Sequence, residues 1–457
     1  MTHMKKILSV ISTLVFAAAA TALPCLSGCA KSTVKEITIK VPRSSTINSV
    51  ARPDITNAYT LMSLASEDFV KQYGKDVKIN VVEFEAGEET KAITNTFGTD
   101  DAVDILYDGF FNMSSFIHTG NAVPLDDVLP AEALADLNST YVTNGKFNGK
   151  LYMLPYMASQ NILIYNKEML RQCGLDEYAS AEKGVISHWT IEEWTTILDT
   201  LAENLPDGSV PMMMYAKDNQ GDTHIMTILR AFGSDLFDDD GNFNFVDDPA
   251  AMQAFEWLQR GVDKGWYLPV AYFKTMSDNS SKFKMDELAF YNFNLGSSNY
   301  NKAQNDQNDK YGFVNYPGDK CTFFCEGFEV FDNGDSEKIA VAKDFIRYFY
   351  ATDGWLECSA GSIPVSGKVM EKYSGQIFLL DEFNKNAVNA VDFTRNLPNW
   401  QGGADSVRSV FYKEIAKLLM QNVDGTFEYS VEEVAKSLQD KLNAAVQSGR
   451  ANSRYID

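Results

Sequence analysis

The stretch Glu36-Ile-Thr-Ile-Lys-Val41 alternates polar and apolar residues as a half-buried strand does, and Val77-Lys-Ile-Asn-Val-Val82 repeats the pattern. Between these runs, apolar residues recur at helical spacing from Ile55 to Phe69. A further helix-then-strand unit ends in Val103-Asp-Ile-Leu-Tyr107. Repeated strand, helix and strand units predict a parallel sheet with helices on both faces, so the expected fold class is α/β.

The rest of the chain continues this alternation. Thr190-x-x-Glu193 and Ser430-x-x-Glu433 are capping boxes that predict helix starts, and Pro211–Tyr215 reads as a buried strand. Further helices are expected over residues 226–232, 249–262 and 340–350. The chain has 457 residues, and a single core stops growing near ~250–300 residues, so two domains are expected. No Pro/Gly/Ser-rich linker divides the sequence, which predicts that several strand-like crossings join the two domains.

Composition restricts the class of partner. Hydrophobic residues make up 45% and charged residues 22% of the chain, which is typical of a globular protein. The formal net charge of −22 would repel a nucleic-acid backbone, so no nucleic-acid partner is expected.

The N-terminus has the pattern of an export signal. Lys5-Lys6 precede an uncharged apolar run from Ile7 to Leu23, and Leu26-Ser27-Gly28-Cys29 follows. This order resembles the lipobox of bacterial lipoproteins, in which the thiol of the Cys takes up a diacylglycerol. We therefore expect a signal peptide over residues 1–28, a lipid on Cys29 and a tether over residues 29–35. The expected location is the extracellular face of the cytoplasmic membrane.

The remaining cysteines do not indicate a metal site. Cys321 and Cys325 are four apart, and no Cys-x-x-Cys pair or neighbouring His accompanies them. In an extended stretch their Cα atoms would lie ~13 Å apart, too far for a disulfide, so buried small side chains are the favoured interpretation. A bridge such as Cys321 to Cys358 stays open, and Cys173 is a further candidate.

One stretch carries a family resemblance. Asn148-Gly-Lys-Leu-Tyr-Met-Leu-Pro-Tyr156, followed by Ile162-Leu-Ile-Tyr-Asn-Lys167, resembles the extracellular solute-binding protein family 1, the maltose-binding-protein-like group. Other stretches resemble the family's motifs in the same order: Asp104–Tyr107, Ala122–Asp126, Trp189–Trp194, Gly233–Phe243, Lys310–Pro317, Ala342–Ile346 and Gly361–Pro364.

The resemblance implies a type II periplasmic-binding-protein fold, with two interrupted α/β domains, a hinge and a ligand cleft between them. The N-terminal lobe would take residues 36–155 plus 312–350, and the C-terminal lobe residues 156–311 plus 351–457. The implied function is capture of a carbohydrate, expected to be an oligosaccharide, for an ABC importer. The implied partners are the permease subunits and the membrane. The chain is expected to be a monomer without enzyme activity, cofactor or metal.

Sugar capture needs amide or carboxylate groups beside aromatic rings, because buried hydroxyls need hydrogen bonds and sugar faces stack on rings. Three loops mix these types, Asp108–Asn112, Tyr291–Asn294 and Asn399–Gln401. From this mixture and the resemblance, the expected ligand-binding residues are Arg43, Ser44, Asp108, Phe110, Phe111, Asn112, Tyr156, Gln160, Gln220, Thr223, Asn292, Asn294 and Trp400, with Glu326 and Arg395 as further candidates.

Several residues have a simpler interpretation. Trp189, Trp194, Trp257 and Trp355 lie on helix patterns and are expected to pack in the core. Asp238-Asp-Asp-Gly241 does not fit the EF-hand spacing, so an acidic turn is the better interpretation.

Three alternative functions stay open at this point. The first is binding of a non-sugar solute. A polyamine would be bound by Asp108 and Glu326, and an anion such as a phosphate ester by Arg43 and Arg395. A peptide is a further candidate ligand. A glycosidase using two carboxylates is the second, although the chain has no Gly-x-Ser-x-Gly, His-Glu-x-x-His, P-loop or Rossmann motif. The third is a surface adhesin for glycans.

Overall fold

The structure is a computed structural model that describes residues 34–74, 76–85, 87–217, 221–392, 396–400 and 405–453. Residues 34–457 form one compact unit. The predicted signal peptide and the expected lipid acceptor Cys29 lie outside the described residues, as do Gln220 and Arg395. Among the described helices, none combines the length and the apolar composition that crossing a bilayer requires.

The fold is α/β around one large sheet, so the predicted fold class is confirmed. The predicted parallel pairing holds for β1 with β2 and β3, but the sheet as a whole is mixed, because β11 pairs antiparallel with β3 and β6. The strands are β1 Lys35–Pro42, β2 Val77–Phe84, β3 Ile105–Gly109, β4 Lys146–Phe147, β5 Lys150–Leu151, β6 Leu154–Asn166, β7 Ile186–Ser187, β8 Val210–Met212, β9 Leu288–Phe293, β10 Tyr311–Val314, β11 Cys321–Val330, β12 Ile363–Pro364 and β13 Ala390–Asp392.

The helices alternate with these strands. They are α1 Ala58–Tyr73, α2 Glu89–Ala92, α3 Phe110–Ile117, α4 Ala131–Asp136, α5 Ser139–Asn144, α6 Lys167–Gln172, α7 Asp176–Ala179, α8 Ile191–Asn204, α9 Gly221–Ala231, α10 Pro249–Asp263, α11 Met276–Lys284, α12 Tyr300–Gln304, α13 Ser336–Ala351, α14 Asp353–Leu356, α15 Gly367–Tyr373, α16 Leu380–Lys385, α17 Val407–Ile415 and α18 Val431–Asn452.

Local sequence sets the starts of these helices. The side chains of Thr190 and Ser430 each accept a hydrogen bond from the backbone N–H three residues on, which confirms both predicted capping boxes. A third capping box, Thr275 with Asp278, starts α11. The four tryptophans expected to pack, Trp189, Trp194, Trp257 and Trp355, are buried.

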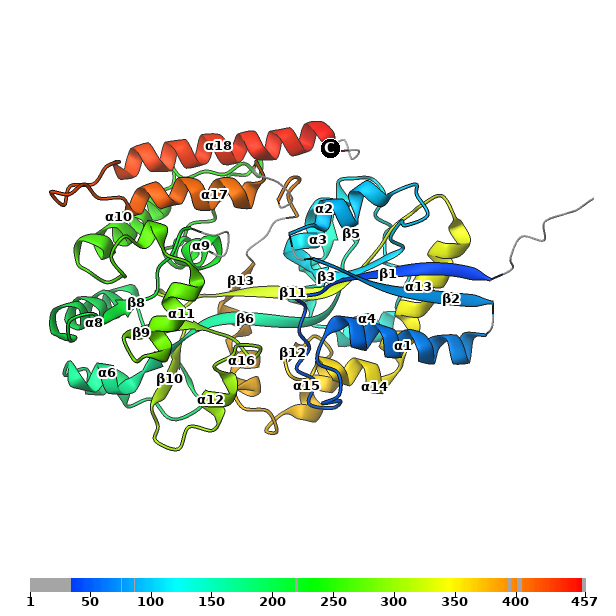
Figure 1. Cartoon of the computed structure of the whole chain (residues 1–457), viewed down its shortest axis with the longest axis horizontal. Coiled ribbons are helices and arrows are strands. Elements are labelled where there is room, and N and C mark those ends of the chain that lie inside the picture. Colours follow the sequence, from blue (N-terminus) through cyan, green and yellow to red (C-terminus); the bar gives the residue numbers. More distant parts are fainter. Residues whose placement is uncertain are drawn as a thin grey trace, which may run out of the picture. The chain divides into compact units, whose positions relative to one another are not determined.

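Two strands run through the middle of the sheet (Figure 1). The first part of β6, Leu154–Asn161, pairs with β11 over Thr322–Phe328, and β11 pairs in turn with β3. The second half of β6 pairs with β9 and β10. We call β1, β2 and β3 the first strand group and β7, β8, β9 and β10 the second strand group. β6 and β11 connect the two groups.

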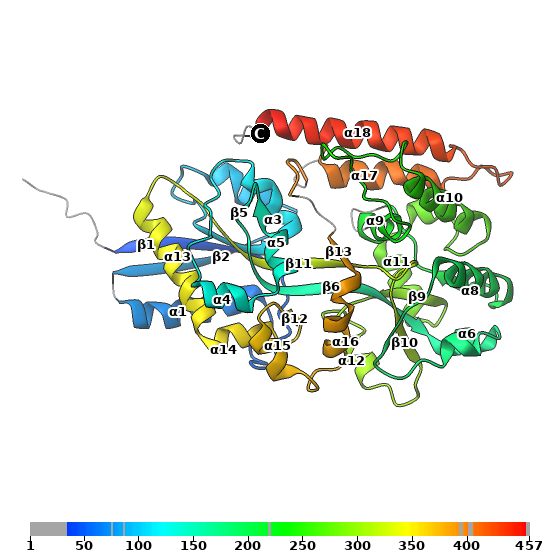
Figure 2. The same cartoon turned by 180° about the vertical axis from the view of Figure 1, so that it is seen from behind.

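Helices cover both groups. In Figure 1, α2 and α3 lie above the strands of the first group and α1 lies below them. On the second group, α18 contacts α17 and α10, and both views show α17 and α18 along its upper side (Figures 1 and 2).

The lobe boundaries expected near Pro155, Tyr311 and Tyr350 stay predictions. Beyond Tyr350, the chain still contacts helices on the side of the first group: Ser366 Oγ donates to Asp136, and the N–H of Asn138 donates to the carbonyl of Val365. Contacts with the second group begin with the carbonyl of Phe378, which accepts from Tyr300. We therefore propose that the third boundary follows Tyr373.

The four described cysteines are free thiols, so the Cys321–Cys358 bridge left open above does not form. Cys321 and Cys325 are buried, as expected from their aromatic surroundings. The acidic turn is also as expected, because the Asp238 carboxylate accepts from the N–H groups of Asp240 and Asn242.

A glycine fixes the contact between the two connecting strands. The β6–β11 register shifts between Glu326 and Gly327, and a Cβ on Gly327 would lie 2.0 Å from the carbonyl oxygen of Leu154. We expect Gly327→Ala to destabilise the protein by about 1–3 kcal/mol, because the strands would have to separate. Thermal unfolding followed by circular dichroism measures the loss.

The matched control is Gly354→Ala on α14, where a Cβ would meet no atom within 4 Å. Its melting temperature should stay the same or rise slightly, because alanine favours helix over glycine. Equal melting temperatures for the two variants would contradict the close approach at Gly327.

Candidate functional site

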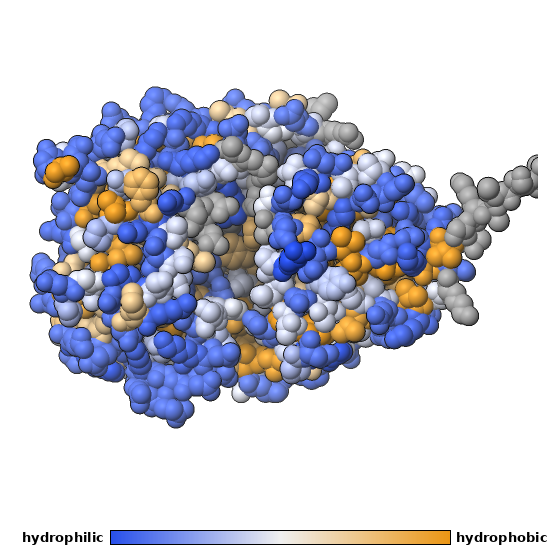
Figure 3. Space-filling view, in the orientation of Figure 1, coloured by the Kyte–Doolittle hydropathy of each residue, from blue (hydrophilic) through white to orange (hydrophobic). Residues whose placement is uncertain are grey.

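A cavity of ≈ 400 Å³ lies beside the middle of β6 and β11. We call it the cleft cavity. Its lining comes from both strand groups: Thr46 and Phe111 belong to segments that follow β1 and β3, whereas Asn292 and Tyr316 belong to segments of the second group. In Figure 3 the face of the molecule is hollowed near its middle, and hydrophilic residues predominate around the hollow. A volume of this size lies within the ~300–1,000 Å³ range of small-molecule sites.

The two connecting strands supply the floor of the cavity. Ser159 and Asn161 on β6 both line it, as do Phe324 and Glu326 on β11. Residues two apart on a strand share a face, so Ser159 and Asn161 lie on one side of β6, and Phe324 and Glu326 lie on one side of β11. Phe324 stands opposite Ser159 in the register.

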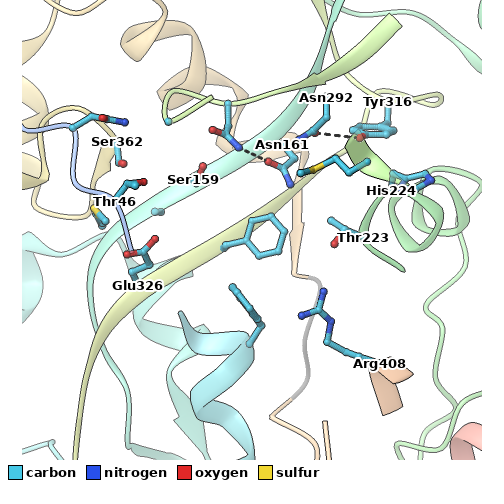
Figure 4. Close-up of a pocket in the computed structure, with 18 of the residues that line it drawn as sticks. Thr46, Ser159, Asn161, Thr223, His224, Asn292, Tyr316, Glu326, Ser362 and Arg408 are labelled. Atoms are coloured by element: carbon cyan, nitrogen blue, oxygen red, sulfur yellow. Dashed lines mark hydrogen bonds between the residues drawn. The ribbon is translucent and has the colours of Figure 1, made fainter. Parts of the chain in front are cut away.

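Amides from the second group complete the polar lining (Figure 4). Asn294 Nδ2 donates to Asn161 Oδ1 at 2.9 Å, and the Tyr316 hydroxyl donates to Asn292 Oδ1 at 3.4 Å. Each of these bonds fixes the orientation of an amide. The Nδ2 groups of Asn161 and Asn292 donate to no described residue and can therefore bind an acceptor in the cavity.

Two phenyl rings and a guanidinium form one edge of the cavity. The rings of Phe111 and Phe324 meet edge to face with centroids 5.8 Å apart. The guanidinium of Arg408, from α17, lies 5.4 Å from the centroid of Phe111. Arg408 and Phe111 belong to elements far apart in the sequence, so this cation–π contact joins α17 to α3.

Burial shifts the pKa values of two ionisable groups in the cavity lining, Glu326 and His224. Desolvation raises the pKa of Glu326 to about 7, although weak hydrogen bonds from the hydroxyls of Ser45 and Tyr107 act in the opposite direction. Burial lowers the pKa of His224 to about 3, so this imidazole is neutral near pH 7.

Five of the expected ligand-binding residues line the cavity together: Phe111, Thr223, Asn292, Asn294 and Glu326. Phe110 and Asp108, which precede Phe111 in the chain, do not line the cavity. Phe110 is buried in the core, and the buried carboxylate of Asp108 accepts hydrogen bonds from Gly109 N–H and Asn112 Nδ2. Adjacent residues at the start of α3 face different directions, so only one of the two phenylalanines reaches the cavity.

Other expected residues lie away from this lining. Ser44 is exposed, and the exposed Arg43 side chain pairs with Glu83 and Glu85 instead of turning toward the cavity. On β6, the Tyr156 hydroxyl donates to the carbonyl of Trp355, and Gln160 Nε2 donates to the carbonyl of Phe383.

The side chains of Tyr156 and Gln160 are fully buried because they are on the face of β6 opposite Ser159 and Asn161. Trp400 is also fully buried and does not line the cavity. Gln220 and Arg395 fall outside the described residues.

Sequence reasoning missed several lining residues, among them Ser159, Asn161, Tyr316 and Arg408. The alternation of β6 carried a signal for the first two, because neighbours of Gln160 must face the opposite side. Arg408 had no local signal, since α17 reaches Phe111 only through tertiary packing.

Comparisons with known proteins agree with this architecture. The family model described as bacterial extracellular solute-binding protein matches residues 52–354. A binding protein of Brucella abortus (strain 2308) is 22% identical over 175 residues, which is 38% of this chain. The matched segment spans only 39% of that relative's own length.

Two solved structures share the fold. The cyclic α-maltosyl-1,6-maltose binding protein from Arthrobacter globiformis superposes with a TM-score of 0.68 at 20% identity, covering 91% of this chain and all (100%) of that one. The sugar-binding protein MalE from Xanthomonas citri gives a TM-score of 0.69 at 13% identity, covering 91% and 98%.

The raised pKa of Glu326 has a consequence for stability. The pKa of Glu326 is about 7 in the folded protein, and its ordinary value is 4.5. Between pH 4.5 and pH 7 the folded protein therefore keeps a proton on Glu326 that the unfolded chain has lost. The free energy of unfolding therefore falls as the pH rises from about 4.5 to 7. We expect Glu326→Gln to be more stable than the parent by about 1–3 kcal/mol at pH 8, and equally stable near pH 4.

Urea unfolding at a series of pH values measures this difference. Glu182→Gln is the matched control, because Glu182 is exposed and its side chain makes no hydrogen bond or ion pair with the described residues. A gain for Glu326→Gln that is the same at every pH would argue against an ionisation effect.

Proposed function

The chain belongs to the bacterial extracellular solute-binding proteins, and from this premise we propose that it captures a carbohydrate in the cleft cavity and delivers it to the permease of an ABC importer. Members of this class bind solutes without transforming them. The observation that carries the proposal is the lining of the cavity, which combines amides, hydroxyls and phenyl rings.

This lining suits the chemistry of a sugar. Hydroxyl groups of a buried sugar need partners, and Asn161, Asn292, Ser159 and Thr223 offer donors and acceptors on opposite sides of the cavity. The apolar face of a sugar ring can stack on Phe324. The Arthrobacter and Xanthomonas structures are both named as sugar-binding proteins, which supports the same class of ligand.

The size of the cavity favours a short ligand. Its ≈ 400 Å³ lies near the lower end of the ~300–1,000 Å³ range for ligand sites. We therefore propose a mono- or short oligosaccharide. Capture would proceed by hinge closure, with β6 and β11 bending where they pass between the two strand groups. The closed form would present both groups to the permease.

The location follows from the N-terminal sequence. We propose that residues 1–28 are removed on export and that the Cys29 thiol receives a diacylglycerol, which would hold the protein at the extracellular face of the membrane. In this position the protein would meet its solute outside the cell and its permease in the same membrane.

Replacement of Asn292 tests the site. We expect Asn292→Ala to weaken sugar binding about 5- to 150-fold, because a buried ligand hydroxyl left without its partner costs about 1–3 kcal/mol. A thermal-shift screen against mono- and oligosaccharides finds the ligand, since saturation at 100 times Kd adds about 2.7 kcal/mol of stability. Calorimetric titration then compares the affinities.

Asn301→Ala, an exposed asparagine on α12, is the control and should bind like the parent. The proposed function fails if no sugar in the screen raises the melting temperature of the parent protein.

Replacement of Cys29 tests the anchor. We expect Cys29→Ser to abolish incorporation of labelled fatty acid and to release the protein from the membrane fraction, because the hydroxyl does not accept the lipid. Cys25→Ser, four residues earlier, should incorporate label like the parent. Labelling of the Cys29→Ser protein would place the lipid elsewhere and contradict the proposed anchor.

A further inference from the structure

Among the residues that the structure describes, one carboxylate lines the cleft cavity, that of Glu326. Glu326 is half-buried, and its partners are two hydroxyl groups at long distances: Ser45 Oγ at 3.4 Å and the Tyr107 hydroxyl at 3.5 Å, both to Oε2. Hydroxyl-to-carboxylate bonds are usually near 2.7 Å, so these contacts are weak. The other oxygen, Oε1, makes no hydrogen bond with the described residues. The charge of this carboxylate is thus poorly compensated by the protein.

Two cations that lie close to Ser45 in the sequence are engaged elsewhere. Arg43, two residues before Ser45, pairs with Glu83 and Glu85. Lys40 Nζ donates to the carbonyls of Ala92 and Asp101. Among the described residues, none forms an ion pair with Glu326. Removing a charged carboxylate from water costs free energy when no positive group pairs with it. A cation on the ligand would pair with Glu326 and reduce this desolvation cost.

The cationic side chain in the described lining, that of Arg408, lies apart from Glu326. Arg408 and Glu326 stand on different elements and well apart in Figure 4, and the guanidinium of Arg408 faces the ring of Phe111. The cavity is therefore polarised, with a carboxylate at the end near the first strand group and a guanidinium at the end near α17.

The neighbouring acid adds little charge to this end of the cavity. Asp108 lies on β3, beside the strand that carries Glu326, and burial raises its pKa to about 8, so it is mostly protonated near pH 7. Within the described parts of the chain, no three His, Cys, Asp or Glu side chains are placed to hold a metal ion. An organic cation is thus the better match for this end of the cavity.

The neighbouring ring suits the same partner. Phe324 stands two residues before Glu326 on β11, so both side chains face the cavity. An ammonium group that approaches the carboxylate would also lie near the face of this ring, which attracts cations. The same ring can stack on the apolar face of a sugar.

From this arrangement we propose that Glu326 receives a protonated amino group of the solute, so that the cavity prefers amino sugars to the corresponding neutral sugars. The inference rests on the proposed function, because the amides and hydroxyls of the lining still bind the sugar ring. It adds that one substituent of this ring is an amine directed at β11.

Matched pairs of sugars test the preference on the full-length protein. The probes are glucose with glucosamine, galactose with galactosamine, and cellobiose with fully deacetylated chitobiose, each titrated by calorimetry at pH 7. In at least one pair we expect the amine to bind about 10- to 100-fold more tightly, as charge-assisted hydrogen bonds allow. The preference should shrink in 1 M NaCl, because salt screens the charges.

Glu326→Gln keeps the size of the side chain and removes its charge. We expect this variant to bind the two members of the pair with affinities within about threefold of each other, so that the preference for the amine is lost. A cooperative thermal unfolding transition shows that the variant is folded. Glu182→Gln, at an exposed position, should keep the preference.

The outcomes separate the two proposals. If neutral sugars bind and no amine binds more tightly, the inference is wrong while sugar capture stands. If the amine preference survives in Glu326→Gln, another group receives the amine and the inference is also wrong. If neither sugars nor amino sugars bind the parent, the proposed function fails, and the inference fails with it.

Discussion

The antiparallel ladder between β6 and β11 is the constraint on which the rest of the structure depends. These two strands carry the chain between the strand groups, and their backbone hydrogen bonds keep the two strands in register. Gly327 permits the closest approach, because any side chain there would meet the carbonyl of Leu154. With the ladder fixed, Ser159 and Phe324 stand opposite each other, and the floor of the cleft cavity is set by backbone geometry before any ligand arrives.

Along β6, residues that line the cavity alternate with residues that pack in the core. Ser159 and Asn161 face the cavity, whereas the residue between them, Gln160, is fully buried on the other side. The Gln160 amide donates to the carbonyl of Phe383 on α16 and to the Tyr141 hydroxyl on α5. These hydrogen bonds connect β6 to the two helices. A shift of one residue in register would exchange these roles, which is why both faces of the strand must be specified at once.

This division also explains how far sequence reasoning could go. Strand alternation and capping boxes are local, so the strands β1 and β2 and the helices that begin after Thr190 and Ser430 could be predicted. Phe111 and Asn292 could be predicted to line a cleft, although they belong to α3 and β9 and not to the loops that the sequence suggested. The contact of Arg408 with Phe111 depends on where the fold places α17 relative to α3, and no local pattern encodes that placement.

Three acidic residues lie on β3 and β11, namely Asp108, Glu326 and Glu329, and they differ in burial and in pKa. Glu329 is fully buried, and neither of its oxygens bonds to a described residue; desolvation raises its pKa well above the ordinary value. Burial also raises the pKa of Asp108 to about 8, so both groups are protonated near neutral pH. Glu326 has the lower pKa, about 7, and it alone of the three lines the cavity.

Near neutral pH the three acids therefore carry less than one negative charge between them, and most of that charge is on Glu326, where a solute can reach it. A protein that needed only to fold would gain stability from neutral side chains at these positions. Strongly shifted acids beside a cavity are typical of sites that act on a ligand, and here the one acid that ionises most readily is the one that faces the solute.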